Sequence, residues 1–447
     1  MKTSHINQKS NLRNLINTAL ALMMTVALGF GLVLPAYALP TDEAPAGSQA
    51  AITKILETPI GTILPSDLVY SFFVEKIAED GQTPSSLMPT IGTGGIVEIP
   101  FLANTPVYNT DGDTDIRFLE SYDIFLGKTW PHGGIYEYKV TEVDSMPNHP
   151  IGTDPKEEMY FSKAEYTLKV YVNDQLQITH IGALRTVDDA GQTIDPEDQK
   201  KLIVTPGGGT EDDLDYSEMT FTNTYAKTND TTEITDPDEW TLAISKEVAG
   251  DYANKSFYFD FDLTVNAPSL ITTAPTYKAY IVEPDTANPG KYKVVTNPAE
   301  FNGITGGAGG LIEVKSGQPI SFKLKHGQKL AFINTHVGAN YLVTETGSAD
   351  YTPKASVYVA SQTKGVETVA SLGDGLTLHH IDNDVYKTTL YVGDGGKNSA
   401  DFTNTHFADV PTGISVDDLP FVILIGLTVA ALAGYITIKA RRRRYVA

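Results

Sequence analysis

The sequence between residues 45 and 408 repeats one pattern twice, and this repetition limits the possible folds more than any other feature. Each half opens with a lysine in an apolar run, later contains Tyr-x-Val-Thr-Glu, and closes on Phe-Thr-Asn-Thr. The lysine, glutamate and asparagine of these motifs are Lys54, Glu142 and Asn223 in the first half and Lys246, Glu345 and Asn404 in the second. A repeat of this length predicts two similar structural units in tandem.

Short alternating or apolar runs dominate both halves, and helical periodicity is hard to find in them. Examples are residues 69–74, 166–172 and 257–263, which are rich in β-branched and aromatic side chains. Gly, Pro, Asn and Asp separate these runs. This pattern is typical of an all-β fold of the sandwich kind.

A polar stretch at 227–239, which has one large apolar residue, divides the two halves. We interpret it as a linker between β-sandwich domains at 45–226 and 240–408. The length of 447 residues is compatible with two or three domains.

The N-terminus has the layout of a secretory signal peptide. Positive residues (Lys2, Lys9 and Arg13) precede a mostly apolar run, and Ala36-Tyr37-Ala38 offers small residues at the two positions that a signal peptidase reads. We predict that residues 1–38 are removed, with an uncleaved membrane anchor as the alternative.

The C-terminal segment, 410–447, contains twenty residues without a charge, 419–438, followed by a basic tail. That length is enough to cross a bilayer, and the basic tail predicts that the bulk of the chain lies outside the cell.

The chain has a formal net charge of −22 and no cysteine. Such acidity repels phosphate backbones, so we expect no nucleic-acid partner. Without cysteine the chain has no disulfides, thiol catalysis or thiolate metal sites, and mechanical strength would need another cross-link. We expect no cofactor. We also expect no metal site, because Asp111–Asp115 starts like a calcium loop but has Ile116 and Tyr122 where that loop needs Gly and Glu.

The repeated Lys, Glu and Asn together suggest a chemical reaction. First and last strands of a sandwich are often neighbours, so a Lys on one and an Asn on the other could both face the core. Burial favours the neutral, nucleophilic amine and a protonated carboxyl. The amine could then attack the Asn side-chain carbon and release ammonia, which leaves an amide between the two side chains.

This order of motifs resembles the streptococcal pilin isopeptide-linkage domain, the repeat of T-antigen-type backbone pilins. The resemblance implies two tandem Ig-like (CnaB-type) sandwiches. It also implies isopeptide bonds Lys54–Asn223 and Lys246–Asn404, promoted by Glu142 and Glu345 respectively.

The C-terminal sequence Val410-Pro411-Thr412-Gly413, followed by the apolar run and basic tail, resembles a sortase sorting signal. A pilin-class sortase would cut between Thr412 and Gly413. It would then pass the Thr412 carboxyl to a Lys of another subunit or to peptidoglycan.

Polymerisation needs an acceptor lysine. In related backbone pilins it lies shortly before the strand that carries the linking Asn, where Lys200 and Lys201 are the nearest candidates. Lys163 and Lys169 are competitors, and the Tyr-Pro-Lys-Asn pilin motif is absent.

We therefore interpret the chain as a structural pilin subunit of a Gram-positive cell surface and not as an enzyme, apart from single-turnover bond formation within itself. Its expected partners are a pilin-class sortase, other copies of itself, minor pilins and peptidoglycan. One alternative is a monomeric, sortase-anchored adhesin that binds a host ligand. Another is a surface enzyme such as a glycosidase, for which the sequence indicates no carboxylate pair.

Overall fold

β-strands make up most of the regular secondary structure in the computed structural model of the chain. The structure describes residues 47–146, 149, 151, 156–207, 216–296, 307–360, 366–378, 390–406 and 419–444. The predicted signal peptide, 1–38, and the motif residues Val410, Pro411, Thr412 and Gly413 lie outside these ranges.

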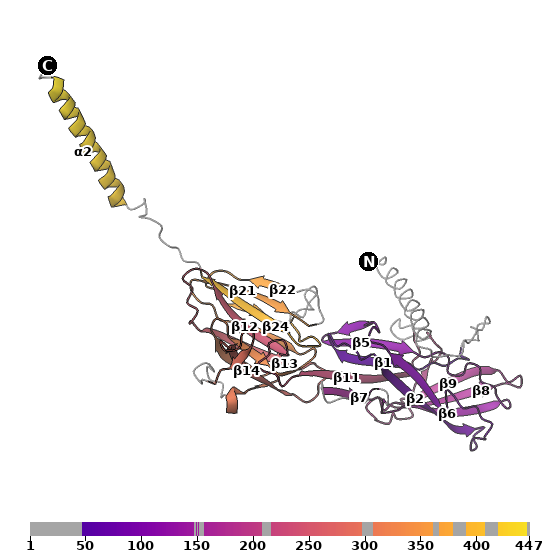
Figure 1. Cartoon of the computed structure of the whole chain (residues 1–447). Coiled ribbons are helices and arrows are strands. Elements are labelled where there is room, and N and C mark those ends of the chain that lie inside the picture. Colours follow the sequence, from indigo (N-terminus) through magenta and orange to yellow (C-terminus); the bar gives the residue numbers. More distant parts are fainter. Residues whose placement is uncertain are drawn as a thin grey trace.

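The strands of the first half lie in two sheets (Figure 1). Their bounds are β1 (Thr53–Pro59), β2 (Leu68–Glu79), β3 (Ile96–Phe101), β4 (Asn109–Asp111), β5 (Thr114–Glu120), β6 (Gly134–Glu142), β7 (Lys156–Tyr160), β8 (Glu165–Val172), β9 (Ile178–Val187), β10 (Lys201–Leu202) and β11 (Thr220–Asp230). One sheet has the order β11-β1-β5-β4 with β7 also on β11, and the other has the order β10-β9-β8-β6-β2-β3.

The second half also forms two sheets within the described residues. Its elements are β12 (Leu242–Ala249), β13 (Phe259–Asn266), β14 (Thr276–Pro284), β15 (Tyr292–Val294), the 3-10 turn η2 (Ala308–Gly310), β16 (Ile312–Lys315), β17 (Ile320–Leu324), β18 (Lys329–Phe332), β19 (Asn334–His336), β20 (Asn340–Glu345), β21 (Tyr351–Tyr358), β22 (Val366–Val369), β23 (Leu376–Leu378) and β24 (Ser399–His406). One sheet runs β15-β14-β18-β12-β24-β21-β22 with β16 on β14, and the other runs β17-β13-β20-β23. The prediction of a mostly β fold is confirmed.

Alternation along the strands builds one large apolar core in each half, beside a smaller cluster around Trp240. In β8 the buried residues are Tyr166, Leu168, Val170 and Val172, at every second position. Successive side chains of a strand point to opposite faces, so this period directs one face of each sheet inward. One large cluster draws its buried residues from 50–225, and the other draws them from 242–402.

The first and last strands of each half are neighbours and run parallel. Lys54 of β1 is opposite Phe221 of β11, and Lys246 of β12 is opposite Phe402 of β24. The register is therefore the same in both halves, so the repeat in the sequence corresponds to a repeat in strand pairing.

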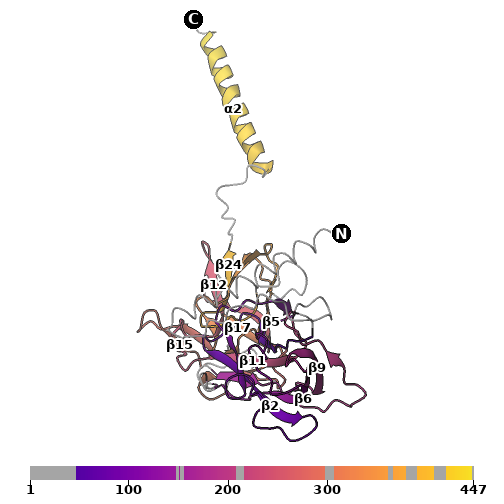
Figure 2. The same cartoon turned by 90° about the vertical axis from the view of Figure 1, so that its right-hand side faces the viewer.

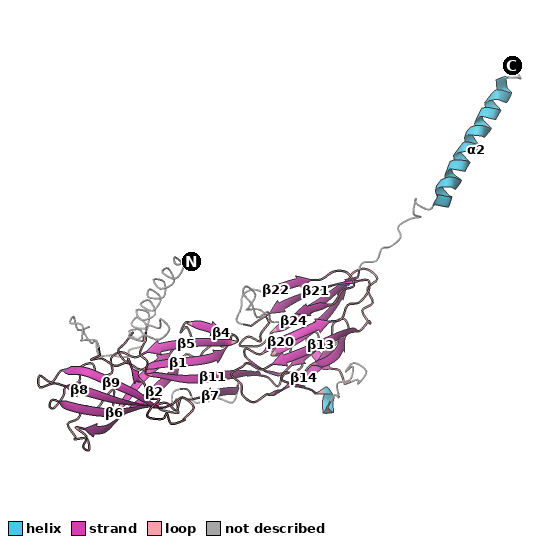
Figure 3. Cartoon of the chain, turned by 180° about the vertical axis from the view of Figure 1, so that it is seen from behind, coloured by secondary structure: helices cyan, strands magenta, loops and turns pink. Residues whose placement is uncertain are grey.

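The two halves lie end to end and share a strand (Figures 1 and 3). β11 continues past residue 226 into the predicted linker, and its residues 228–230 pair with β19 of the second half. Side chains reinforce this contact: Lys227 pairs with Asp394 at 2.8 Å, and Asn229 Nδ2 donates to the Gly393 carbonyl. The view along the long direction shows β11 near the middle of the molecule (Figure 2).

The C-terminal helix α2 (Leu419–Arg444) covers the predicted membrane segment. Within the part of the chain that is described, no helix was found that is long and apolar enough to cross a membrane. The span at 419–438 stays a prediction from the sequence.

Candidate functional site

The three residues predicted to react in the first half lie together in its core. Lys54 and Asn223 are fully buried, and the Glu142 side chain has no exposed surface. The Lys54 ammonium nitrogen lies 3.0 and 3.1 Å from the two Glu142 carboxyl oxygens. Asn223 Nδ2 donates to Glu142 Oε1 at 2.8 Å. Glu142 thus contacts both groups that the proposed bond would join.

The second half contains the same arrangement. Lys246 Nζ lies 2.8 Å from Glu345 Oε1, and Asn404 Nδ2 donates to that oxygen at 2.6 Å. All three side chains are at most 2% exposed. The structure therefore brings together both predicted sets of three.

Strand geometry explains why these motifs converge. Lys54 is paired with Phe221, and Asn223 lies two residues further along β11, so Lys and Asn face the same side of the sheet. In Tyr-x-Val-Thr-Glu, the Tyr, Val and Glu are also spaced by two, which places Glu142 on the core face of β6 in the opposite sheet. The same spacing places Glu345 on the core face of β20.

An aromatic ring lies beside each of the two lysine nitrogens. Lys54 Nζ lies 4.8 Å from the ring centre of Tyr70, and Lys246 Nζ lies 4.2 Å from that of Phe259. These rings offer weak cation–π attraction but little hydration, so they do not replace the water that a charged amine has lost.

Burial shifts the ionisation of both pairs toward the neutral forms. It lowers the pKa of Lys54 and of Lys246 from 10.5 to about 8, although the adjacent carboxylates act in the opposite direction. Burial raises the pKa of Glu142 and Glu345, which the neighbouring lysines partly offset. A neutral amine and a protonated carboxyl are the forms needed for attack on an amide and for proton transfer.

Two contacts in the first half were not anticipated from the sequence. The Ser162 backbone N–H donates to Asn223 Oδ1 at 2.7 Å, and the Ser162 hydroxyl donates to Asp189. Ser162 lies between β7 and β8, outside every repeated motif, so no sequence signal marked it.

The candidate acceptor lysines lie at the surface. Lys200 and Lys201 are exposed, and Lys201 begins the edge strand β10. Lys163 is also exposed, whereas Lys169 pairs with Glu137 at 3.2 Å. None of these contacts singles out one acceptor.

The acidic segment Asp111–Asp115 spans the end of β4, the turn that follows it and the start of β5. Asp113 accepts hydrogen bonds from the backbone and hydroxyl of Ser269 in the second half. Asp115 accepts from Thr110 and from the Gly61 backbone. Asp113 therefore links the first half to the second, and Asp115 links β5 to β4 and to the turn after β1.

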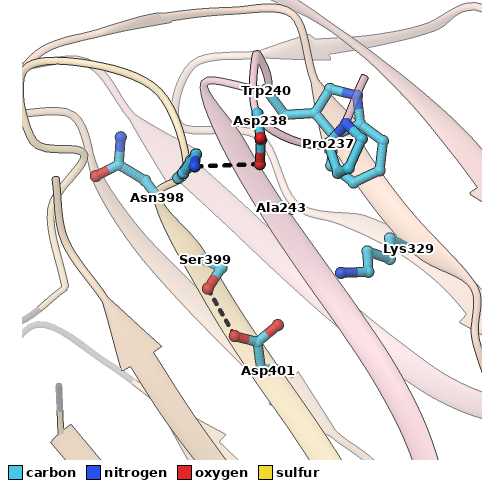
Figure 4. Close-up of a pocket in the computed structure, with 9 residues that line it drawn as sticks. Pro237, Asp238, Trp240, Ala243, Lys329, Asn398, Ser399 and Asp401 are labelled. Atoms are coloured by element: carbon cyan, nitrogen blue, oxygen red, sulfur yellow. Dashed lines mark hydrogen bonds and ion pairs between the residues drawn. The ribbon is translucent and has the colours of Figure 1, made fainter. Parts of the chain in front are cut away.

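A small pocket of about 230 Å³ lies at the start of β12, away from both sets of three. Trp240, Lys329, Asn398 and Asp401 help to line it, and Ser399 points toward Asp401 (Figure 4). Sites for small molecules usually enclose about 300–1,000 Å³, so this pocket is below their range.

The fold and the site define a class: a tandem β protein in which each half buries a lysine, a glutamic acid and an asparagine in mutual contact. A pilin of Streptococcus pyogenes serotype M1 is 23% identical over 385 residues, covering 85% of this chain and 87% of the pilin. The chain is homologous to this T-antigen-type pilin.

Solved structures and one family model also match. The crystal structure of the major pilin from Streptococcus pyogenes is 19% identical and covers 80% of this chain and 99% of its own, with a TM-score of 0.29. The structure of the major pilin protein T-13 from Streptococcus pyogenes is 16% identical and covers 80% of this chain and 98% of its own, with a TM-score of 0.26. Residues 240–406 match a family described as a domain of unknown function, DUF7601.

Proposed function

We propose that the chain is a structural pilin subunit, exported by its signal peptide and joined by a sortase through Thr412 to other subunits or to the cell wall. Each half is an Ig-like, CnaB-type domain closed by its own Lys–Asn isopeptide bond. The observation that carries the proposal is the duplicated set of Lys, Glu and Asn, whose side chains lie buried in contact with one another and on the same strand register in both halves. Homology to a pilin supports the structural rather than enzymatic role.

The reaction follows from the contacts of Glu142. Neutral Lys54 attacks Cγ of Asn223, and the carbonyl π electrons move onto Oδ1. Glu142 takes a proton from the attacking nitrogen and passes a proton to Nδ2. The Cγ–Nδ2 bond then breaks, ammonia leaves, and one amide joins the two side chains. Glu345 acts in the same way on Lys246 and Asn404.

The first test is the intact mass of residues 39–412, the chain that would remain after removal of the signal peptide and cleavage after Thr412. We expect a mass below the sequence value by two ammonia molecules. In Glu142→Ala and in Glu345→Ala one cross-link should be lost, so the mass should lie below the sequence value of that variant by only one ammonia molecule. A full sequence mass in the unmodified protein would refute both isopeptide bonds.

The second test concerns polymerisation. Cells that express the chain together with a pilin-class sortase should yield ladders on denaturing gels. Lys200→Arg and Lys201→Arg identify the acceptor if either abolishes the ladder, with Lys163→Arg and Lys169→Arg as comparisons. A single wall-linked band would instead favour a monomeric adhesin.

A further inference from the structure

The two asparagines differ in how their carbonyl oxygens are bound. Asn223 Oδ1 accepts a hydrogen bond from the Ser162 backbone N–H at 2.7 Å. Among the residues that the structure describes, Asn404 Oδ1 is buried without a hydrogen-bond partner, and so is Glu345 Oε2. The amide nitrogens of both asparagines, by contrast, donate to their glutamates alike.

We propose that the Ser162 backbone N–H is a catalytic oxyanion donor for the first-half bond, and that Lys54–Asn223 therefore forms faster than Lys246–Asn404. This inference rests on the proposed isopeptide chemistry. When Lys54 Nζ adds to Cγ of Asn223, the electron pair of the C=O bond moves to Oδ1. An N–H group already in contact with that oxygen stabilises the developing charge without reorganisation. Collapse of the intermediate returns the electron pair to the C=O bond and expels Nδ2 as ammonia.

The same N–H also touches the proton-transfer group. Ser162 N lies 3.2 Å from Glu142 Oε2, so it is shared between the carboxyl and the amide oxygen. The contact to Asn223 is the shorter of the two, and it strengthens as negative charge builds on Oδ1. The donor therefore favours the transition state over the starting amide.

Asp189 is the positioning residue for this donor. The Ser162 hydroxyl donates to Asp189 Oδ1 at 2.5 Å, and the backbone N–H of Thr222, next to Asn223, donates to the same oxygen at 3.0 Å. Arg185 holds the other oxygen at 2.6 Å. The carboxylate thus joins the segment that carries the donor to the strand that carries the reacting amide.

The negative charge of Asp189 disfavours the reaction, whereas its hydrogen bonds to Ser162 and Thr222 would favour it by positioning the donor. These two effects have opposite signs, so an experiment can separate them. The negative charge raises the pKa of Lys54 and so favours the unreactive ammonium. Removal of that charge alone would speed bond formation near neutral pH. A slower reaction in Asp189→Ala would therefore report lost positioning.

The experiment follows both bonds in the same molecule. Residues 39–412 are purified in denaturant from inclusion bodies and refolded by dilution, and samples are quenched over time. Peptide mass spectrometry then measures the two cross-linked peptides separately. We expect the first-half bond to form faster in the unmodified chain.

Four variants test the donor and its support. Ser162→Pro removes the N–H and should slow the first-half bond by about 10²–10³-fold, with the second-half bond unchanged. Ser162→Ala and Asp189→Ala keep the N–H but lose its anchor, and should slow the same bond by a smaller factor. Asp189→Asn keeps an oxygen acceptor and should recover most of the rate. The upper limb of the pH–rate profile should shift to lower pH in both Asp189→Ala and Asp189→Asn, because both variants lack the negative charge that raises the pKa of Lys54.

Ser245→Ala is the matched control, because Ser245 is a buried serine of the second half whose hydroxyl also binds a carboxylate, Asp401. It should leave the first-half rate unchanged. Near-UV circular dichroism checks folding, and if Ser162→Pro fails to fold, Ser162→Ala and Asp189→Ala decide the question. An unchanged first-half rate in the folded variants would overturn the oxyanion role alone. Absence of both cross-links in the unmodified chain would instead overturn the proposed function.

Discussion

At the scale of single residues, the buried lysines set the chemistry. Lysine is rarely fully buried unless it is paired, and here each lysine has one glutamic acid and an aromatic ring as near neighbours. The two partners shift each other's ionisation, so each pair titrates as a unit. The singly protonated pair includes the reactive form, in which the lysine is neutral and the carboxyl carries the proton.

The first prediction concerns the pH dependence of bond formation. The first-half rate should follow a bell, because a second proton blocks the amine at low pH and loss of the last proton removes the acid at high pH. The upper limb should lie near the lowered Lys54 pKa of about 8, and the lower limb above the ordinary Glu value of 4.5. Refolding at a series of pH values, with the first-half peptide as the readout, measures the profile. A rate that still rises at pH 10 would contradict it.

The second prediction concerns stability without the bond. Burial lowers the pKa of Lys54 to about 8 in the folded chain, against an ordinary value of 10.5. In Asn223→Ala the lysine stays unbonded, and we expect the same direction of shift between the folded and the unfolded chain. The unfolded chain therefore binds more protons between these values, and the free energy of unfolding should rise with pH across that window. The full gain is about 3 kcal/mol, lost again as pH falls to 8. Urea titrations at several pH values measure it.

The control for that measurement is Asn223→Ala combined with Lys54→Met, which should show a flatter dependence between pH 8 and 10.5. An equal slope in the two proteins would mean that Lys54 does not titrate as its burial implies.

At the scale of elements, the last strand of each half carries a residue that packs the core and a residue that would react, both on its core face. In β24 the core face carries Phe402 and Asn404, whereas Thr403 faces the other way and is partly exposed. Phe402 packs edge-on against Phe261 of the opposite sheet with ring centres 5.3 Å apart. The same strand thus holds the two sheets together and presents the reacting amide.

The third prediction tests this alternation. In an Asn404→Ala background, which removes the cross-link, Phe402→Ala should lower the free energy of unfolding by about 3–5 kcal/mol because it leaves a cavity between the sheets. Thr403→Ala, one position away, should change it by less than about 1 kcal/mol. Chemical denaturation of both variants provides the comparison. Equal effects would show that the two positions do not face different environments.

At the scale of the whole molecule, the halves are joined by more than a flexible linker. β11 adds a strand pairing with β19, and Asp394 is held by Lys227 and by the backbone N–H of Ile63. Gly338 also fits closely against the first half: a Cβ atom there would lie 2.6 Å from Cβ of Pro59. The two halves are therefore connected by backbone pairing, by an ion pair and by close packing at Gly338.

The fourth prediction is that Gly338→Ala loosens this junction. The added methyl group would clash with Pro59, and the positive φ of 78° adds backbone strain. We expect calorimetry to separate the unfolding of the two halves and small-angle scattering to show a wider range of overall dimensions. Gly373→Ala is the matched control, because its φ is 82° but no atom lies within 4 Å of its Cβ position. Equal behaviour of the two variants would mean that strain alone, and not the contact, is responsible.

Much of the site was predictable from the sequence. Lys54, Glu142 and Asn223 were identified because the same order recurs at Lys246, Glu345 and Asn404, and the mostly β fold followed from strand-length alternation. Both signals are local or repeated, so one sequence suffices to reveal them. The extension of β11 into the polar stretch at 227–230 was not predicted, because its partner β19 lies about a hundred residues away and polar residues there pair through the backbone.

By itself, the sequence determined the duplicated β architecture and the identity of the residues that could react, because alternation and repetition are written along the chain. The tertiary structure alone decided what surrounds those residues. Ser162 N reaches Asn223 only through the packing of the segment between β7 and β8, and Asp394 reaches Lys227 only across the junction. Contacts between unrepeated residues far apart in the chain leave no periodic signal, since they depend on how the sheets pack.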